Sequence, residues 1–280
     1  MTPSLRIVSA SPAELLPAFA ALYGAPAEEL GWLTDSLTHA WAALDEGDVV
    51  LGALGVRPSP AHGGELMGGA LPGEWEVEVG AALAQAAREE VGPVYAFADG
   101  GMLRAEALAA AGLREVAAYR MLAGLTPIAQ AEAPAGIRLL PLSDVPDLAL
   151  RLDALATYED RIGHHAVSPA AAEDGAGGYD PTLSLLAVDE HGQAAGICRA
   201  APEEGYARLD APGVRPDLRH TALRQALLLG VCALARERGF GDISLESWGD
   251  TPEELAADLG LGLEIQLENP IYGTVPKPLH

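Results

Sequence analysis

Residues 206–238 contain the pattern whose residue types and spacing could do chemistry. Alternating residues at 206–211 predict a half-buried strand, and apolar residues from Leu223 to Ala235 recur at helical spacing after Pro212 and Pro216. The first N–H groups of a helix have no intrahelical partner and carry partial positive charge, so this turn could hold a phosphate. An ordinary strand–helix unit gives the same pattern, because the turn lacks the glycines of phosphate-binding loops. Both interpretations stay open at this point.

The composition limits the partners that the chain could have. Its 280 residues include 17 basic and 40 acidic side chains, which gives a net charge of −23. Such a surface repels nucleic acid and anionic membranes, so we expect neither as a partner. It favours a small cationic molecule or a basic peptide, although acidity also serves solubility. The length allows one large domain or two ordinary ones, and both a monomer and a homodimer remain open.

Two cysteines, Cys198 and Cys232, give neither a disulfide framework nor the spacing of a metal site. We therefore expect two buried free thiols and no metal cofactor. Such cysteine usage indicates the reducing cytoplasm as the location. The N-terminal residues lack a basic region followed by an apolar core, so no signal peptide is expected. The longest apolar run is too short to cross a bilayer.

The elements around the turn occur twice along the chain. A strand, a proline-containing turn and a helix at 5–22 are echoed at 137–155, and the Pro- and Ala-rich segment 126–136 is expected to be a linker. Each half then continues to a long helix, a strand, a shorter helix and final strands. A repeat of this length predicts two duplicated domains, 1–126 and 137–280, of α/β or α+β class with mixed sheets.

Several further segments carry their own predictions. We expect a helix over 28–46, and irregular structure with short helices over 156–181. A helix over 251–259 should have Asp250 as its N-cap. The chain should end in two strands, with the first at 263–267 and the second at 271–275.

This order of elements resembles the GNAT N-acetyltransferase superfamily, twice over nearly the whole chain. The superfamily signature V-x-P-x-x-[RQ]-x-x-G-x-[GA] is matched by Val214, Pro216 and Arg219. Ala222 replaces its first glycine, and Arg224 replaces its second small residue. The resemblance implies two tandem GNAT-like acyl-CoA N-acyltransferase domains, each a mixed, mostly antiparallel sheet flanked by helices.

The resemblance also implies an acetyl-CoA site in the C-terminal half, with acetyl-CoA as cosubstrate. Backbone N–H groups at the turn would cradle the diphosphate, and the backbone of Val214 would contact the thioester oxygen. Arg224 is expected either to crowd the diphosphate or to pair with it. The expected coenzyme-binding residues are Val214, Arg219, His220, Thr221, Ala222, Leu223 and Arg224.

The implied reaction is acetyl transfer to an amine, which needs a base for the ammonium proton and often an acid for the thiolate. Asp210 lies where many relatives place a carboxylate base, and Glu246 on the next strand is a second candidate. The usual tyrosine of the fourth helix is replaced by Ala256, so Tyr272 or Tyr206 could supply the acid. Each of these side chains could equally be an ordinary solvated or core residue. The alternative function is a non-catalytic relative that binds a ligand or partner through the same cleft.

The irregular region corresponds to the substrate-gripping helices of the superfamily. Glu159 and Asp160 in this region would suit a cationic acceptor, either a small-molecule amine or a basic peptide. The neighbouring His164 and His165 are expected on a surface loop, because no other spaced ligands accompany them.

The matching turn of the N-terminal half is acidic. Trp75 replaces the arginine of the signature, and Glu74, Glu76 and Glu78 crowd the place of the diphosphate. Three carboxylates outweigh the roughly 0.3–1 kcal/mol that a helix end offers to a favourable charge. We therefore expect this half to be degenerate: it would be structural or shape the substrate cleft, without binding coenzyme A.

Overall fold

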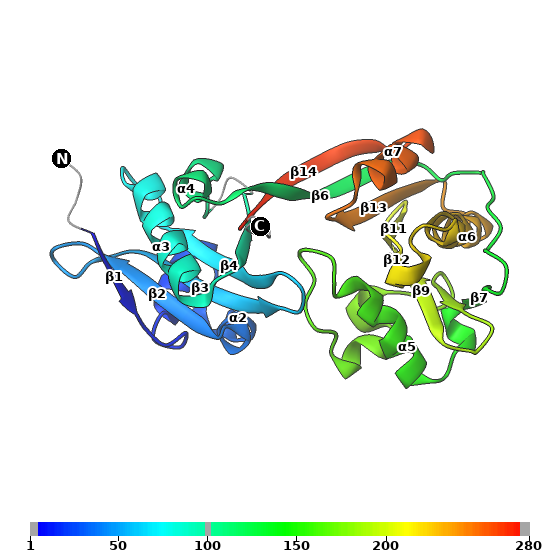
Figure 1. Ribbon diagram of the computed structural model, residues 1–280, viewed down its shortest axis with the longest axis horizontal. Helices are drawn as coiled ribbons and strands as arrows, with labels where there is room; N and C mark the ends of the chain where they lie inside the picture. The colour runs from blue at the N-terminus through cyan, green and yellow to red at the C-terminus, as the bar shows by residue number, and fades with distance from the viewer. Residues whose placement is uncertain (1–4, 99–101, 275–280) are drawn as a thin grey trace, which may run out of the picture. The chain divides into compact units, whose positions relative to one another are not determined.

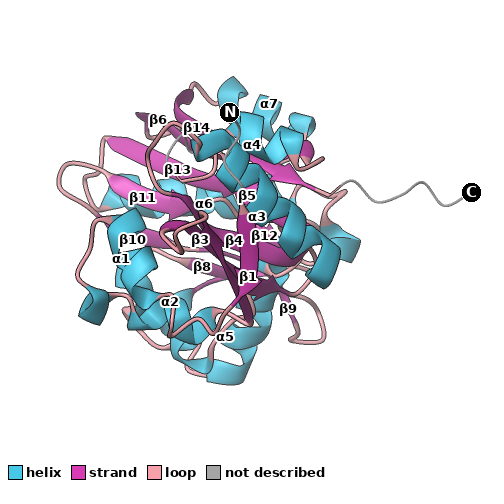
Figure 2. Ribbon diagram, turned by 90° about the vertical axis from the view of Figure 1, so that its left-hand side faces the viewer, coloured by secondary structure: helices cyan, strands magenta, loops and turns pink. Residues whose placement is uncertain are grey.

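The computed structural model describes residues 5–98 and 102–274, which form two compact units. The first unit contains the described residues up to Ala118 and those from Asn269 onward, and the second contains Tyr119–Glu268. Each unit combines mostly antiparallel strands with flanking helices (Figure 1, Figure 2), which confirms the predicted fold class.

The first unit pairs its strands in chain order. Strands β1 to β4 are antiparallel neighbours, and β4 and β5 pair in parallel across a helical connection. Its helical elements are α1 (Leu16–Tyr23), η1 (Ala27–Glu29), α2 (Gly31–Ser36), α3 (Glu76–Val91) and α4 (Ala105–Ala110). Its strands are β1 (Arg6–Ser9), β2 (His39–Leu44), β3 (Val50–Ser59), β4 (Gly63–Ala70), β5 (Val94–Phe97), and parts of β6 (Arg114–Leu125) and β14 (Glu264–Gly273).

Both faces of this sheet are buried, as the alternation along β2 shows. Ala40 and Ala42 belong to a core that contains α1 and α2 residues, whereas Trp41 and Ala43 belong to a core that contains α3 residues. A strand covered on both faces loses the period-2 pattern of apolar and polar residues. The predicted helix over 28–46 is therefore wrong beyond α2, because pairing with β1 and β3 makes the alanine-rich β2 a strand.

The second unit contains two sheets. One has the order β12-β9-β8-β7 and is antiparallel, and the other has the order β6-β13-β11-β10 with β11 and β13 parallel. Its helical elements are η2 (Leu142–Asp144), α5 (Leu148–Leu155), η3 (Ala156–Tyr158), η4 (Pro169–Ala172), η5 (Ala176–Gly178), η6 (Pro216–Leu218), α6 (Leu223–Glu237) and α7 (Pro252–Gly260). Its strands are β7 (Arg138–Pro141), β8 (Leu185–Val188), β9 (Ala194–Cys198), β10 (Ala200–Pro202), β11 (Ala207–Asp210), β12 (Gly213–Val214) and β13 (Asp242–Trp248), besides parts of β6 and β14.

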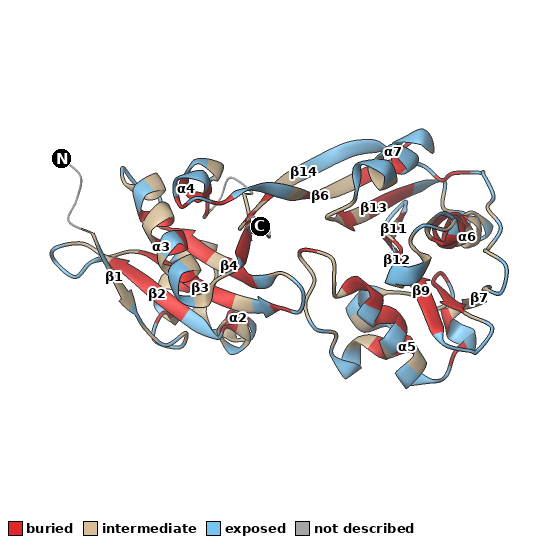
Figure 3. Cartoon of the chain, in the orientation of Figure 1, coloured by how far each residue is buried: buried red, intermediate tan, exposed pale blue. Residues whose placement is uncertain are grey.

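The core of the second unit repeats the two-sided plan of the first. Along β8, Leu185 and Ala187 pack in the core that contains α6, whereas Leu186 and Val188 pack in the core that contains α5. Figure 3 shows the buried residues of α6 and β9. The long helices α3 and α6 thus occupy corresponding places, as duplication of one fold requires.

The final strand of each half completes the sheet of the other unit. β6 follows α4 in the chain, yet its residues 119–125 pair with β13. β14 follows α7, yet its residues 271–273 pair with β5. The boundaries 1–126 and 137–280 stay a proposal for the repeats, because the compact units do not follow them.

Three local expectations can be compared with the structure. The two strands predicted at the end of the chain form the single strand β14, and Val275 lies outside the described residues. Thr251, and not Asp250, caps α7: its hydroxyl accepts the N–H of Glu254, whose carboxylate accepts the N–H of Thr251. The short helices expected over 156–181 are present as the 3₁₀ helices η3, η4 and η5.

The two cysteines are buried free thiols, as predicted. Burial raises the pKa of the Cys232 thiol to about 12, which makes it a poor nucleophile at neutral pH. None of the helices described in the structure has the length and apolar character needed to cross a bilayer.

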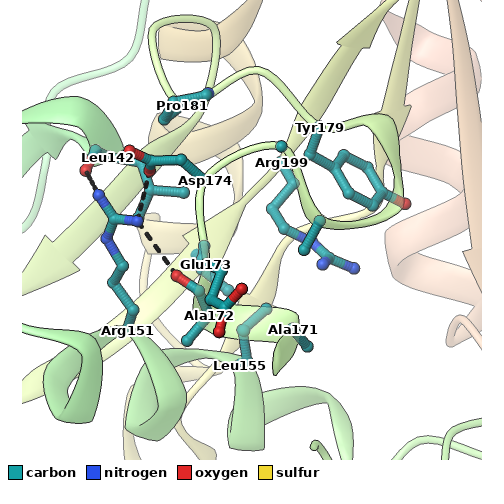
Figure 4. A pocket seen from close by; sticks show the side chains of 13 residues that line it. Leu142, Arg151, Leu155, Ala171, Ala172, Glu173, Asp174, Tyr179, Pro181 and Arg199 are labelled. Carbon is teal, nitrogen blue, oxygen red and sulfur yellow. Dashed lines mark hydrogen bonds and ion pairs between the residues drawn. The ribbon is translucent and has the colours of Figure 1, made fainter. Parts of the chain in front are cut away.

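Arg151 ties the irregular segment to the residues that precede α5 (Figure 4). Its buried guanidinium donates to the carbonyl oxygens of Leu142, Val145 and Ala172, and to the carboxylate of Asp174 at 2.6 Å. These bonds tie α5 to η2 and η4, and an apolar side chain cannot replace them.

Replacing Arg151 by methionine keeps the aliphatic stem but leaves three carbonyl oxygens without this donor. We expect Arg151→Met to lower the free energy of unfolding by about 2–4 kcal/mol in urea denaturation. Arg138→Met, at an exposed position of β7, should change it by less than about 0.5 kcal/mol. Equal losses in the two variants would contradict the role assigned to these hydrogen bonds.

Candidate functional site

The candidate site lies where β11 and β13 stop pairing. Asp210 is the last paired residue of β11, opposite Glu246, and the N–H of Ala211 donates to the Glu246 carbonyl at 2.7 Å. Pro212 has no N–H to continue this ladder. β12 then pairs with β9 in the other sheet, while β13 stays beside β6 (Figure 1). The two strands therefore separate just before the turn into α6.

The pairing of β12 with β9 sets the direction of the Val214 N–H. The N–H of Arg215 donates to the carbonyl of Ala195 on β9 at 2.9 Å. Because successive N–H groups of a strand point to opposite edges, the N–H of Val214 points away from β9, toward the edge that β13 has left. This is the backbone donor that the resemblance suggests for the thioester oxygen.

Asp210 is buried in an ion pair. The Nε and Nη2 atoms of Arg199 lie 3.0 and 2.7 Å from its Oδ2, and the Tyr179 hydroxyl donates to its Oδ1 at 2.5 Å. The Arg199 guanidinium also lies 3.9 Å from the centre of the Tyr179 ring, and Figure 4 shows the two side chains together. Burial raises the pKa of Tyr179, so its phenol stays protonated. Both oxygens of Asp210 accept these bonds, which makes it a counter-ion and a poor candidate for a base.

Glu246 is the partly buried carboxylate beside this ion pair. Its Oε2 lies 3.5 Å from Nη1 of Arg208, which also bonds to Glu203 and to the Tyr179 hydroxyl. Burial raises the pKa of Glu246, and the charge of Arg208 opposes that rise. A carboxylate of raised pKa is better matched to accepting a proton near neutral pH. Of the two predicted bases, the structure favours Glu246.

The expected anion-binding turn is formed by η6 and the first turn of α6. Arg219 donates through Nε to the carbonyl of Val214 at 3.0 Å, and its Nη2 lies 2.6 Å from Oδ1 of Asp160. Ala222 at the N-cap offers no side-chain acceptor to the helix. The turn brings together Val214, Arg219, His220, Thr221, Ala222 and Leu223.

Arg224 does not lie with these turn residues. The expectation that it either crowds the diphosphate or pairs with it is therefore corrected. The Arg224 guanidinium is buried and makes two hydrogen bonds to Asp258 of α7, at 2.8 and 2.7 Å. Glu254 and Asp250 lie 3.6 and 3.9 Å away. The carboxylates on and beside α7 therefore hold Arg224, which neither crowds an anion at the turn nor pairs with one.

The acids of the irregular segment form internal bonds. Glu159 accepts the N–H of Val167 at 2.7 Å, and Asp160 pairs with Arg219. The prediction that they suit a cationic acceptor is therefore not supported by their contacts. Glu173 and Asp174 line a groove of about 660 Å³ together with Tyr179 and Arg199, and Asp174 also pairs with Arg151.

His164 and His165 lie in a stretch without regular secondary structure, as predicted, and both side chains are partly buried. His164 stacks on Tyr158 with ring centres 5.2 Å apart, and it meets the edge of Trp248 at 5.1 Å. Burial lowers the pKa of His164 to about 4, so the ring is neutral at pH 7. Within residues 5–98 and 102–274, no group of three or more His, Cys, Asp or Glu side chains is arranged to hold a metal.

The acid role of Tyr272 stays a prediction. Tyr272 belongs to the first unit, opposite Ala96 of β5, where it packs against the core of that unit. Tyr206 is exposed next to β11. Sequence patterns missed Tyr179, which lies in the irregular segment. Arg199 had a signal, because it is a charged residue in the apolar run AAGICRAA.

The first unit presents acidic residues at the corresponding turn, as the sequence indicates. Helix α3 begins after Trp75, which packs against the core, and Glu76 and Glu78 lie in its first turn. Glu76 pairs with Arg104 at 2.9 Å. That this turn does not bind coenzyme A stays a prediction.

Two curated relatives are similar in sequence, whereas no family model matches the chain. A mycothiol acetyltransferase of Clavibacter sepedonicus is 31% identical over 244 residues, which cover 83% of this chain and 76% of the relative. A mycothiol acetyltransferase of Clavibacter michiganensis subsp. michiganensis is 33% identical over 191 residues, or 64% of this chain, and the match spans only 61% of that relative's length.

A solved structure shares the fold along nearly the whole chain. The GCN5-related N-acetyltransferase from Sphaerobacter thermophilus is 19% identical, with coverage of 98% of this chain and 96% of that chain and a TM-score of 0.53. This similarity concerns the fold, and the sequence similarity to the Clavibacter sepedonicus protein extends over more than two thirds of both chains. The chain belongs to the GNAT N-acetyltransferase superfamily.

Proposed function

We propose that this protein transfers an acetyl group from acetyl-CoA to an amine, and that it uses the site in residues 137–280. The separation of β12 from β13 is the observation that carries this proposal. It leaves the N–H of Val214 without a partner strand on one edge, directly before the helix end that suits a diphosphate. The two related acetyltransferases support the same class of reaction.

The coenzyme end of the site depends on α6 and Arg219. The first N–H groups of α6 and its dipole favour an anion, and Arg219 adds a cation whose side chain is 30% exposed. Arg224 contributes little charge to the turn, because Asp258 neutralises it. The corresponding turn of the first unit carries glutamates, so we assign coenzyme binding to the second unit alone.

The chemical step forms a bond between the amine nitrogen and the acetyl carbon and breaks the bond from that carbon to sulfur. The ammonium must first lose a proton. We assign Glu246 as the base that accepts this proton, directly or through water. The N–H of Val214 would stabilise the oxyanion. The released thiolate belongs to a thiol with a pKa of roughly 8.5, so water can reprotonate it without a dedicated acid.

We assign the acceptor to the groove lined by Glu173, Asp174, Tyr179 and Arg199. It borders the Asp210 ion pair. Asp174 is paired with Arg151, so Glu173 is the carboxylate that we assign to a cationic acceptor. A small-molecule amine or a basic peptide meets that requirement, and the net charge of −23 supports the same choice.

Calorimetric titration with acetyl-CoA and a thiol-release assay with a panel of amines test the proposal. We expect binding below millimolar concentration, together with thiol release that depends on one class of amine. Absence of binding at millimolar acetyl-CoA would refute the assignment. Binding without release for any amine would favour a ligand-binding relative that has lost catalysis.

A substitution at each turn separates the two units. Arg219→Gln should weaken acetyl-CoA binding by about tenfold or more, because a charge-assisted hydrogen bond to the diphosphate is lost. Charge reversal in Arg219→Glu should weaken it further. Trp75→Phe, at the matching position of the first unit, should leave the Kd unchanged in the same titration. A similar loss in both variants would place the coenzyme elsewhere.

Glu246 can be tested as the base through its pH profile. Glu246→Gln should lower kcat by about 10²–10⁴-fold with little change in the Kd for acetyl-CoA, whereas the exposed Glu203→Gln should stay near wild type. Because a base acts only when deprotonated, kcat should fall as the pH drops through the raised pKa of Glu246. Arg208→Met removes a charge that lowers this pKa, so the acidic limb should move to higher pH. An acidic limb that moves to lower pH, or a fully active Glu246→Gln, would exclude this role.

A further inference from the structure

Residues 157–164 extend from β12 to the end of β13, across the place where the two strands separate. Thr157 and Tyr158 lie against β12 so closely that a Cβ at Gly213 would come within 2.5 Å of the Thr157 hydroxyl. At the other end, His164 contacts Trp248 at the end of β13. The segment therefore lies next to the turn that we assign to the diphosphate.

Two ion pairs hold this segment, and they differ in strength. Arg161 makes a bidentate pair with Glu254 of α7 at 2.8 and 2.6 Å, and the two side chains are only 13% and 17% exposed. Asp160 bonds to Nη2 of Arg219 at 2.6 Å, and these side chains are 39% and 30% exposed. A partly exposed contact through one nitrogen is cheaper to open than a more deeply buried bidentate pair. The Asp160 contact can therefore open while Arg161 keeps the segment anchored.

Asp160 engages one of the Arg219 donors that a diphosphate could use. The Nε of Arg219 is already bonded to the carbonyl of Val214, so Nη2 is the atom that the ion pair engages. A carboxylate oxygen and a phosphate oxygen accept the same charge-assisted hydrogen bond from a guanidinium. The two anions also repel each other, so both cannot occupy this place without cost.

We propose that Asp160 is a built-in competitor of the coenzyme diphosphate for Arg219. In the unliganded protein its carboxylate neutralises Arg219 and fills the cationic side of the turn. The diphosphate, with more charge and the helix end as a further partner, displaces it by a local change of the Asp160 side chain. The affinity for coenzyme is thereby set below the value that the turn alone would give. This inference rests on the proposed acetyl-CoA site.

The test measures coenzyme A binding to the full chain by calorimetry. Asp160→Asn removes the competing charge, and we expect its Kd to be about three- to tenfold lower than that of wild type. Asp153→Asn is the matched control, since it removes the same charge from an exposed position of α5, seven residues away. Its Kd should stay within about twofold of wild type.

A second background shows whether the effect acts through Arg219. In Arg219→Gln, the further change Asp160→Asn should improve binding by less than about twofold, because the shared partner is gone. An equal gain in both backgrounds would show a general charge effect and overturn the proposal. Circular dichroism and thermal unfolding verify that each variant is folded, and Asp160→Ser repeats the test with a smaller side chain.

The outcomes separate this inference from the proposed function. If wild type binds coenzyme A and Asp160→Asn binds equally or more weakly, the competition is refuted while the acetyl-CoA site stands. If neither protein binds at millimolar coenzyme A, the site itself is refuted, and the competition with it. If Asp160→Asn binds coenzyme A more tightly when Arg219 is present, and not in Arg219→Gln, both the acetyl-CoA site and the competition are supported.

Discussion

The end of the ladder between β11 and β13, just before Pro212, shapes the proposed site of the second unit. In a parallel pair every second N–H of a strand donates to its neighbour, and the last such bond here runs from Ala211 to Glu246. From there β12 follows β9 and β13 follows β6, so the backbone of Val214 loses a partner strand on one edge. The position of α6 and its exposed helix end follow from the same separation.

Around this separation, the arrangement of charges follows from burial. The chain is strongly acidic, yet arginines gather where carboxylates are removed from water. Arg199 pairs with Asp210, and Arg224 pairs with Asp258. A buried carboxylate without a partner destabilises the fold. Each of these arginines therefore neutralises a buried carboxylate and is not available to bind a ligand. Arg219 differs, because its partner Asp160 is partly exposed.

The two units share one plan but differ in the charge of one turn. Both place a long helix on one face of a buried sheet and shorter helices on the other, and each receives its final strand from the other half of the chain. The core residues that maintain this plan are apolar in both. The turn into the long helix differs in charge between the units. Glu74 precedes α3 and Glu76 and Glu78 lie in its first turn, whereas Arg219 and Thr221 precede α6.

The sequence by itself determined the duplication, the strand–turn–helix at 206–238 and the contrast in charge between the two turns, because these are local patterns of periodicity and composition. It failed at β2, where burial of both faces removes the period-2 signal. Only the tertiary structure decided the partners of Asp210, Asp160 and Arg224, which come from segments between 11 and 59 residues away. Local spacing cannot specify which distant carboxylate neutralises a given arginine, because that pairing depends on how the strands and helices pack.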